Sequence, residues 1–439
     1  MNPLAIILAA LIGLYTAFGL RRHPRAALVV WLACIIAVPV WPELRIGASL
    51  QPLSVLAVCL LPAVFTHWRG PLKLGDWIMI SFAATSTIAW VGFDAPQFAW
   101  VAVFTQWTAA YLIGRSLGPA AGAEWVTKAI AIAGSVVGTW ALLEFAFSLH
   151  VFEQWFVALD TAGWHTVQIR GSYARSEGAF GHSIAMGGFL ALCVPFVIAS
   201  KIRLVVRVLM LAIVVGGSLV TFSRGAILGV AIAVILSLLF LSGAAISRRS
   251  RVALVLLTTA VSAVAVPWTL SLFDSVSSDL TVSSDYRQDL ALSFVPDLHA
   301  LGLGDGIQIL DGRQFYRQFT SIDNAYALMG LQLGWLPVAI LCLGLIGAAV
   351  RMMRRQGGPA DVTLVSQAVV LATVALITQY GLAVFFIAGL ASGMGAIRRH
   401  GDERGIGLGH RVHRPTATPV VGQVQGEMRS EAATVRSAP

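Results

Sequence analysis

The stretch VRVLMLAIVVGGSLVTFSRGAILGVAIAVILSLLFLSGA, residues 206–244, decides the fold class. It holds two apolar runs, and only Ser223, Arg224 and Gly225 stand between them. Each run is close to the roughly 20 residues that a helix needs to cross a bilayer. The pattern therefore predicts two membrane-spanning helices joined by a very short turn, with an unbalanced cation in that turn.

The whole chain has the same apolar character. Of its 439 residues, 57% are hydrophobic and 12% are charged, and the mean hydropathy is +0.80. Soluble proteins carry about 25% charged residues. We therefore expect an all-α, polytopic integral membrane protein with about 12 or 13 spans. The expected spans are 3–20, 26–42, 52–68, 76–93, 97–114, 126–147, 183–200, 206–222, 226–244, 252–272, 325–349, 362–378 and 382–397. The last two form one apolar stretch, which we divide at 378–381.

These spans define six parts of the chain. The parts are the N-terminal helices 1–147, a first long loop 148–182, central helices 183–272, a second long loop 273–322, C-terminal helices 323–398 and a tail 399–439. This tail is rich in Gly, Pro, Thr, Val and Arg without apolar periodicity, which predicts a disordered cytoplasmic segment.

Basic clusters fall on every second connection between the expected spans. Because cytoplasmic loops carry an excess of Arg and Lys, both long loops and Arg224 should then lie outside. The formal net charge of +9 is spread over such loops, so it does not indicate nucleic-acid binding. The four cysteines lie inside apolar runs without metal-ligand or disulfide spacing. The basic clusters are 21–25, 69–73, 201–207, 248–251 and 351–355.

Several arginines nevertheless fall on the expected outer side. Ionisable groups at a membrane are costly unless they are paired or functional, and arginine suits bidentate binding of phosphate. We expect Arg175 and Arg224, which adjoin span ends and glycines, to bind a lipid-linked phosphate or pyrophosphate. Pairing with nearby acids is the preferred interpretation for Arg313 and Arg317. The other outer arginines are Arg170 and Arg287.

Three segments between roughly residues 165 and 350 carry short motifs. The first has Arg175 ahead of the span entry GAFGH (178–182), and the second has Ser-Arg-Gly at 223–225. The third begins with Arg287 at the head of a loop helix and the turn LGLGDG (301–306). It ends with Asp323, Asn324 and Tyr326, and with Gly334 eleven residues after Asp323. Taken in order, these segments resemble the O-antigen ligase and polymerase superfamily of bacterial membrane glycosyltransferases.

The resemblance implies a GT-C-like fold in the bacterial inner membrane, with the active face outside the cytoplasm. Such an enzyme moves a glycan from an undecaprenyl-pyrophosphate carrier to a glycan or glycolipid acceptor. It uses neither a metal nor a cofactor, and its partners are membrane lipids rather than nucleic acid. The pyrophosphate would be bound by Arg175, Arg224, Arg287 and Ser223.

Asp323 is the first candidate for the catalytic base, His182 the second and Glu177 the third. Helix capping is an equally good interpretation of Asp323 and the preferred one of His182. Glu177 is more simply interpreted as a partner of Arg175 or a cap. The family has a histidine where this chain has Asp323, and this departure favours a polymerase over a ligase.

Three other hypotheses remain open. A transporter or flippase would have a similar number of spans, although it should carry ionisable groups near the middle of the membrane. A glycosyltransferase that uses a polyprenyl-phosphate sugar should have an acid in its first outer loop, and 42–52 contains only Glu43. A structural scaffold leaves the outer arginines unexplained. In the second long loop we expect a helical lid, with a helix from Ser284 to Phe294.

Overall fold

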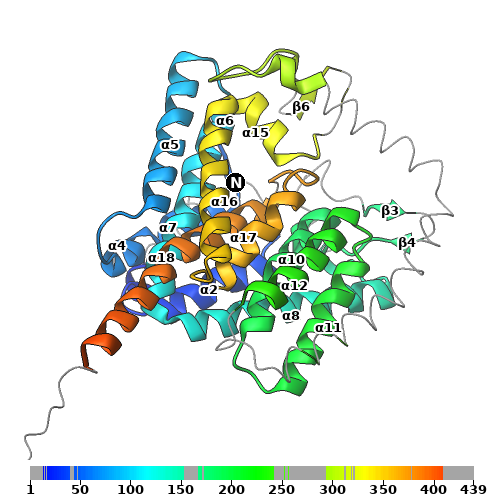
Figure 1. Ribbon diagram of the computed structural model, residues 1–439. Coiled ribbons are helices and arrows are strands. Elements are labelled where there is room, and N and C mark those ends of the chain that lie inside the picture. Colours follow the sequence, from blue (N-terminus) through cyan, green and yellow to red (C-terminus); the bar gives the residue numbers. More distant parts are fainter. Residues whose placement is uncertain are drawn as a thin grey trace, which may run out of the picture. The chain divides into compact units, whose positions relative to one another are not determined.

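The computed structural model is mostly helical (Figure 1). Residues 1–397 form one compact unit and residues 398–439 another. The structure describes residues 13, 15, 17–39, 44–46, 48–152, 167–170, 173–241, 252, 256, 293–310, 313–317, 319, 322–376 and 378–408.

The N-terminal half of the described chain contains α2 (Pro24–Ala37), α3 (Pro52–Cys59), α4 (Leu61–His67), α5 (Leu74–Gly92), α6 (Gln97–Ala102), the π-helix η1 (Val103–Thr108), α7 (Ala109–Ala121) and α8 (Ala123–Phe147). The C-terminal half contains the 3-10 turn η2 (Gly178–Phe180), α10 (Ser183–Ala199), α11 (Leu204–Leu219), α12 (Arg224–Phe240), the 3-10 turn η3 (Val295–Asp297), α15 (Ala325–Leu333), α16 (Trp335–Met353), α17 (Pro359–Val370) and α18 (Thr378–Leu408). Three short antiparallel hairpins occur among the described residues: β1–β2 (Leu44–Ile46 with Ala48–Leu50), β3–β4 (Ile169–Arg170 with Tyr173–Ala174) and β5–β6 (Ile307–Leu310 with Arg313–Tyr316).

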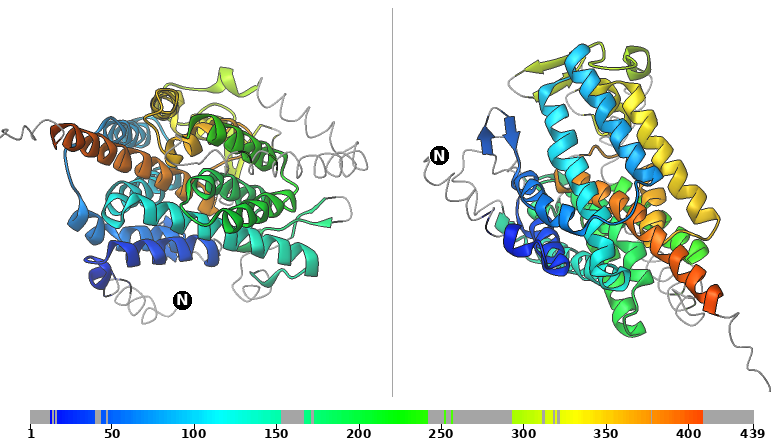
Figure 2. Two further views of the ribbon diagram at one scale, coloured as in Figure 1. Left: turned by 60° about the horizontal axis from the view of Figure 1, so that its bottom comes forward. Right: turned by 90° about the vertical axis from the view of Figure 1, so that its left-hand side faces the viewer.

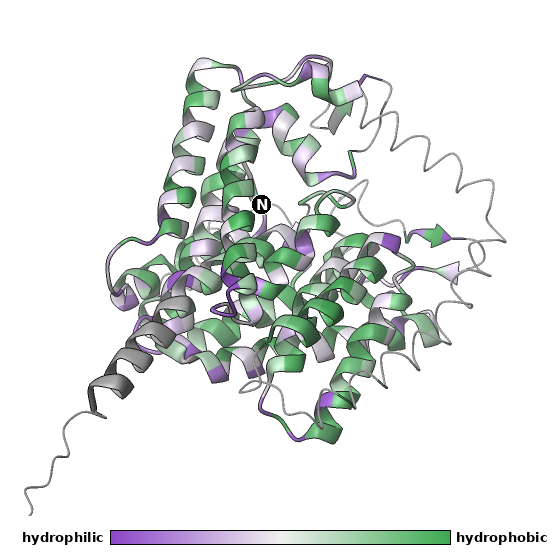
Figure 3. Ribbon diagram, viewed as in Figure 1, coloured by the Kyte–Doolittle hydropathy of each residue, from purple (hydrophilic) through white to green (hydrophobic). Residues whose placement is uncertain are grey.

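The helices are apolar along most of their length (Figure 3). In the described residues, α5, α8 and α16 are long and apolar enough to cross a membrane, judged by length and composition. Further apolar helices, including α2, α10, α11 and α12, have 10–17 residues. The structure thus confirms a mostly helical chain, and three helices of its described part could cross a membrane.

The expected span 325–349 is two helices, because the chain breaks at Gly334. This glycine has a φ of +98°, and a Cβ there would lie 2.5 Å from the carbonyl oxygen of Ala300. The first amides of α16 donate to the preceding loop, Trp335 N to His299 O at 2.9 Å and Leu336 N to Ala300 O at 3.1 Å. The loop therefore satisfies the backbone donors that a continuous helix would satisfy internally.

A second break divides the apolar stretch 362–397 earlier than we expected. Helix α17 ends at Val370, and α18 begins at Thr378, which has a φ of +54°. The carbonyl of Leu371 accepts the amide of Ala325, the first residue of α15, at 2.8 Å. Helix α18 then continues through Leu408, into the segment for which the sequence predicts a disordered tail.

Helix α10 forms the centre of the core and packs against α8, α11, α12 and α17 (Figures 1 and 2). Small residues permit these close contacts. A Cβ at Gly134 of α8 would lie 2.5 Å from Cys193 Cβ of α10, and one at Gly229 of α12 would lie 3.3 Å from Ala191 Cβ of α10. Glycine at such crossings lets helix backbones approach, as is common in membrane bundles.

Helices α5, α8 and α16 each have basic residues near one end and contact a loop between helices at the other end. Helix α8 starts beside Lys201, which pairs with Glu124 at 2.8 Å, and near its other end Glu144 accepts the amide of Gly178 at 3.0 Å. Helix α5 follows Lys73, and the carbonyl of Phe93, just after its last residue, accepts the amide of Leu303 at 3.1 Å. Helix α16 begins against the 299–300 loop and ends in the basic segment 351–355. A helix of the length of α8 separates its ends by about 37 Å.

The described part of the second long loop is a β-hairpin, which we did not predict. Tyr316 and Phe319 pack with Ile322 against α15. Buried Asp297 accepts hydrogen bonds from Arg317 Nη2 at 2.8 Å and from the Tyr316 hydroxyl at 2.7 Å. The prediction that Arg317 pairs with an acid is therefore confirmed. Of the expected helix from Ser284, only residues 293–294 are described, and they are helical; the Arg313 side chain lies outside the described part.

Candidate functional site

The turn between α11 and α12 carries Ser223 and Arg224. Phe222 has a φ of +49°, a left-handed conformation that is costly for a residue with a side chain. Ser223 is the N-cap of α12, and its Oγ accepts the amide of Ala226 at 3.3 Å. Half-buried Arg224 is the first residue of α12. A cation at the positive end of a helix dipole is unfavourable by about 0.3–1 kcal/mol, so the helix itself does not favour an arginine at this position.

The β3–β4 hairpin is bound to this turn by two arginines. Arg170 Nη1 donates to the carbonyl of Phe222 at 2.8 Å, and Arg175 Nε donates to the carbonyl of Thr221 at 2.9 Å. The amide of Ser176 also donates to the carbonyl of Val220 at 3.3 Å. These carbonyls follow the end of α11, so the arginines satisfy acceptors that the helix leaves open. Arg175 is thus partly structural, and it lies next to the turn that holds Arg224.

His182 is the N-cap of α10, which is the interpretation we preferred. Its Nδ1 accepts the amide of Ile184 at 3.2 Å. Burial lowers the pKa of His182 to about 4, and the charge of Arg175 lowers it further, while that of Asp323 opposes the change. The imidazole is therefore neutral at physiological pH, and the hydrogen bond at Nδ1 assigns its proton to Nε2. His182 is placed to donate a hydrogen bond, and its basic nitrogen is already engaged.

Asp323 precedes α15 but does not cap it. Asn324 is the N-cap, and its Oδ1 accepts the amide of Ala327 at 3.0 Å, so the capping interpretation of Asp323 is wrong. The half-buried carboxylate of Asp323 acts electrostatically on both Arg175 and His182. Burial lowers the pKa of Arg175 to about 10 and neighbouring Arg170 lowers it further, while Glu177 and Asp323 oppose the change.

The starts of α10, α12 and α15 meet around the break between α17 and α18. The amide of Ala325 donates to Leu371 O, and a Cβ at Gly225 would lie 2.6 Å from Thr373 Oγ1. A Cβ at Gly187 would lie 2.9 Å from Thr221 Oγ1. Helix N-termini carry partial positive charge and bind anions. We call Arg175, His182, Ser223, Arg224 and Asp323 the arginine site; its charges and helix ends favour an anionic ligand.

Glu177 belongs to a neighbouring carboxylate pair rather than to the arginine site. Its Oε1 accepts the amide of Gln168 at 3.1 Å, and its own amide donates to Glu144 Oε2 at 3.1 Å. Glu144 Oε1 in turn contacts His150 Nδ1 at 3.0 Å. Burial raises the pKa of Glu177 to about 7, although the amide of Gln168 opposes the change. The amide of Gln168 occupies Oε1, so Oε2 is the oxygen that remains for a proton, and the charge of Glu177 also acts on Arg175.

Replacing Glu177 by Gln should flatten the pH dependence of stability. The raised pKa means that the folded state holds a proton more tightly than the unfolded chain. This contribution is therefore complete below about pH 4.5 and is lost as the pH rises through about 7. At pH 8 the variant should be more stable than the wild type by at most about 3 kcal/mol. Thermal melts at pH 5 and pH 8 test this, with exposed Glu124→Gln as the control; an equal shift at both pH values contradicts it.

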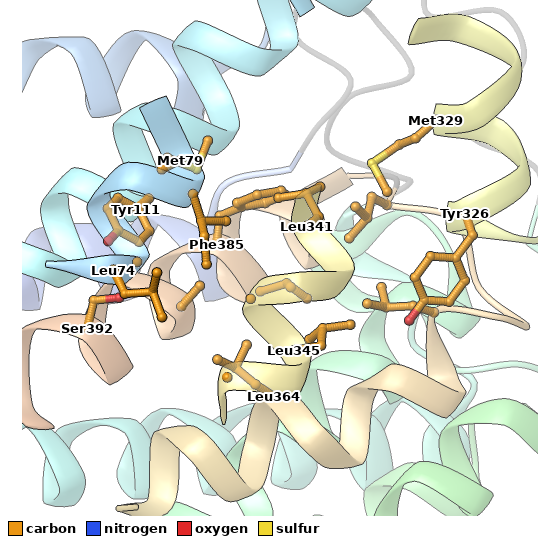
Figure 4. A pocket seen from close by; sticks show the side chains of 18 of the residues that line it. Leu74, Met79, Tyr111, Tyr326, Met329, Leu341, Leu345, Leu364, Phe385 and Ser392 are labelled. Atoms are coloured by element: carbon orange, nitrogen blue, oxygen red, sulfur yellow. The ribbon is translucent and has the colours of Figure 1, made fainter. Parts of the chain in front are cut away.

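An apolar pocket of about 100 Å³ lies between α5, α7 and α15–α18. Tyr326, three residues after Asp323, lines one end with Met329, and Leu74, Tyr111 and Ser392 line the other (Figure 4). Most of its remaining lining is aliphatic. The pocket therefore suits an apolar chain.

No sequence motif marks two residues that support the arginine site. Gln168 accepts a hydrogen bond from Arg175, and Glu144 accepts the amide of Gly178, yet neither lies in a motif or at a regular spacing. Arg287, the third expected pyrophosphate ligand, lies outside the described residues. Within the described part of the chain, His, Cys, Asp and Glu side chains form no group of three suited to a metal ion.

Comparisons with protein-family models, with curated proteins and with solved structures find no match to this chain. The functional assignment therefore depends on the residues and their geometry.

Proposed function

We propose that the protein is a polytopic inner-membrane glycosyltransferase, related to O-antigen ligases and polymerases and GT-C-like in fold. It would transfer a glycan from an undecaprenyl-pyrophosphate carrier to an acceptor sugar on the outer face. The observation that carries the proposal is that Arg175 binds the turn just before Arg224, at the start of α12, and lies within electrostatic reach of Asp323, just before α15. These residues come from separate motifs, and an anion is the ligand that their charges favour.

The arrangement of the long helices supports this orientation. The basic ends of α5, α8 and α16 lie about one helix length from the ends that contact the motif loops. Because basic ends favour the cytoplasm, the arginine site would face outward. The apolar pocket beside Tyr326 would then lie at membrane depth and hold part of the polyprenyl chain.

The site residues supply the groups that the reaction needs. Asp323 would take the proton of the acceptor hydroxyl, whose oxygen attacks the anomeric carbon of the donor. The bond from that carbon to the pyrophosphate oxygen breaks, and its electron pair stays on the phosphate. Arg224, Arg175 and Arg287 would stabilise this charge, as fixed donors do in other transferases. The His182 Nε2–H is available to a phosphate or sugar oxygen.

Deleting the gene and separating the host's surface polysaccharide on a gel tests the proposal. Long chains should disappear and return with the wild-type gene. Single repeat units would then identify a polymerase, whereas chains left on the lipid carrier would identify a ligase. Unchanged polysaccharide in the deletion strain would sink the proposal.

The break between α17 and α18 favours a second candidate, a transporter or flippase for a lipid-linked anion. Discontinuous helices form the substrate sites of many transporters. Purified protein in vesicles separates the candidates, because a flippase moves labelled carrier between leaflets without changing the length of its glycan.

A further inference from the structure

Gln168, in the first long loop just before β3, connects Arg175 of the arginine site with the start of α10 and with Glu177. We propose that it is a positioning residue, which holds Arg175 and the start of α10 in fixed register with the turn that carries Arg224. The inference rests on the proposed function only for its activity readout. Its structural readout is independent of any substrate.

The side chain of Gln168 accepts two hydrogen bonds from different elements. Its Oε1 accepts from Arg175 Nη1 at 2.9 Å and from the hydroxyl of Ser183, the first residue of α10, at 3.1 Å. Its backbone also takes part, because its carbonyl accepts the amide of Arg175 at 2.9 Å and its amide donates to Glu177. Gln168, which is half-buried, therefore connects Arg175, just after β4, with the start of α10 and with Glu177.

Arg175 connects Gln168 to the α11–α12 turn through two hydrogen bonds. Its Nη1 is held by Gln168 while its Nε holds the carbonyl of Thr221. Two bonds at different nitrogens fix the plane of the guanidinium. Among the described residues, Arg175 Nη2 has no hydrogen-bond partner, so it is the donor that remains for a ligand. A guanidinium held in this way stabilises developing charge without first having to be ordered.

Loss of the Gln168 acceptor should therefore loosen the turn and misplace the arginines. Arg175 Nη1 would turn toward water or ligand. The hairpin would keep its backbone bonds and the Arg170 contact to Phe222, and Arg175 would be held by its Nε bond to Thr221 alone. A misplacement of about 1 Å lowers a rate by about 100-fold when it affects groups that stabilise a transition state. The effect should appear in kcat more than in the melting temperature, because Gln168 lies outside the main core.

The test uses three variants of the full-length protein in detergent or vesicles. Gln168→Met removes the acceptor at similar length, and Gln168→Glu keeps two acceptor oxygens. Gln106→Met, at a half-buried glutamine of η1, is the matched control. Hydrogen exchange is followed in the peptide 219–226, and glycan transfer is measured as kcat and KM.

We expect Gln168→Met to speed exchange in 219–226 about tenfold or more and to lower kcat by about 10–100-fold. Gln168→Glu should restore both, and Gln106→Met should change neither. Unchanged exchange in Gln168→Met overturns the inference, and so does faster exchange with unchanged kcat. Wild-type protein that transfers no glycan counts against the proposed function, and in that case the exchange measurement alone decides the role of Gln168.

Discussion

Replacing Arg224 by Gln is expected to lower glycan transfer by about 100- to 1,000-fold while the folded protein keeps its stability. Arg224 is the first residue of α12, and Arg170 and Arg175 bind the two carbonyls of the turn just before it, those of Phe222 and Thr221. A cation at the positive end of a helix dipole is unfavourable by about 0.3–1 kcal/mol. Removing one charge should therefore leave the melting temperature unchanged or raise it slightly. Transfer is measured with purified protein and a lipid-linked glycan.

Two further variants separate geometry from charge. Arg224→Lys keeps the charge but loses the planar pair of donors, so we expect it to restore only part of the activity. Arg203→Gln removes an exposed arginine at the basic end of α11 and serves as the matched control. A fall in melting temperature that accounts for the lost transfer in Arg224→Gln would show that the arginine is structural.

The second large effect is a loss of stability, and it concerns the ion pair of Asp76 with Arg115 near the start of α5. Asp76 and Arg115 are each 2% exposed and form an ion pair at 3.0 Å. Asp76 also accepts the Tyr111 hydroxyl at 2.7 Å and the amide of Lys73 at 2.8 Å. Replacing Asp76 by Asn leaves Arg115 buried without a counter-charge, which costs about 3–5 kcal/mol. Equilibrium unfolding of the purified protein measures this cost.

Two comparisons make the Asp76 test specific. The exposed pair of Glu124 with Lys201 should contribute only about 0–1 kcal/mol, so Glu124→Gln is the control. The double variant Asp76→Leu with Arg115→Met removes both charges and should be much closer to the wild type than Asp76→Asn. A cost below about 1 kcal/mol for Asp76→Asn would contradict the account of this pair.

The sequence predicts the central helices well because their signal is local. The expected spans 183–200, 206–222 and 226–244 correspond closely to α10, α11 and α12. Long apolar runs and the capping residues Ser223 and His182 determine their positions. The breaks at Gly334 and after Val370 are different, because distant backbone groups replace the helical hydrogen bonds there. Hydropathy contains no information about such partners.

The sequence identifies several residues of the candidate site, but it does not reveal the role of each residue. Arg175 acts electrostatically with Asp323 and binds the turn just before Arg224. The sequence does not reveal that Arg175 binds the end of α11 or that Asn324 replaces Asp323 as the cap. Both depend on which of several polar side chains reaches a given backbone group, and this is set by packing over long sequence distances.

Binding of undecaprenyl pyrophosphate to the purified protein tests the central claim most directly. Native mass spectrometry from detergent, with undecaprenyl monophosphate as competitor, compares the wild type with Arg224→Gln and Arg203→Gln. We predict that the wild type and Arg203→Gln retain the pyrophosphate, and that Arg224→Gln binds it at least about tenfold more weakly, as the loss of a charge-assisted contact implies. Equal retention by all three proteins would contradict the claim that the arginine site binds a lipid pyrophosphate.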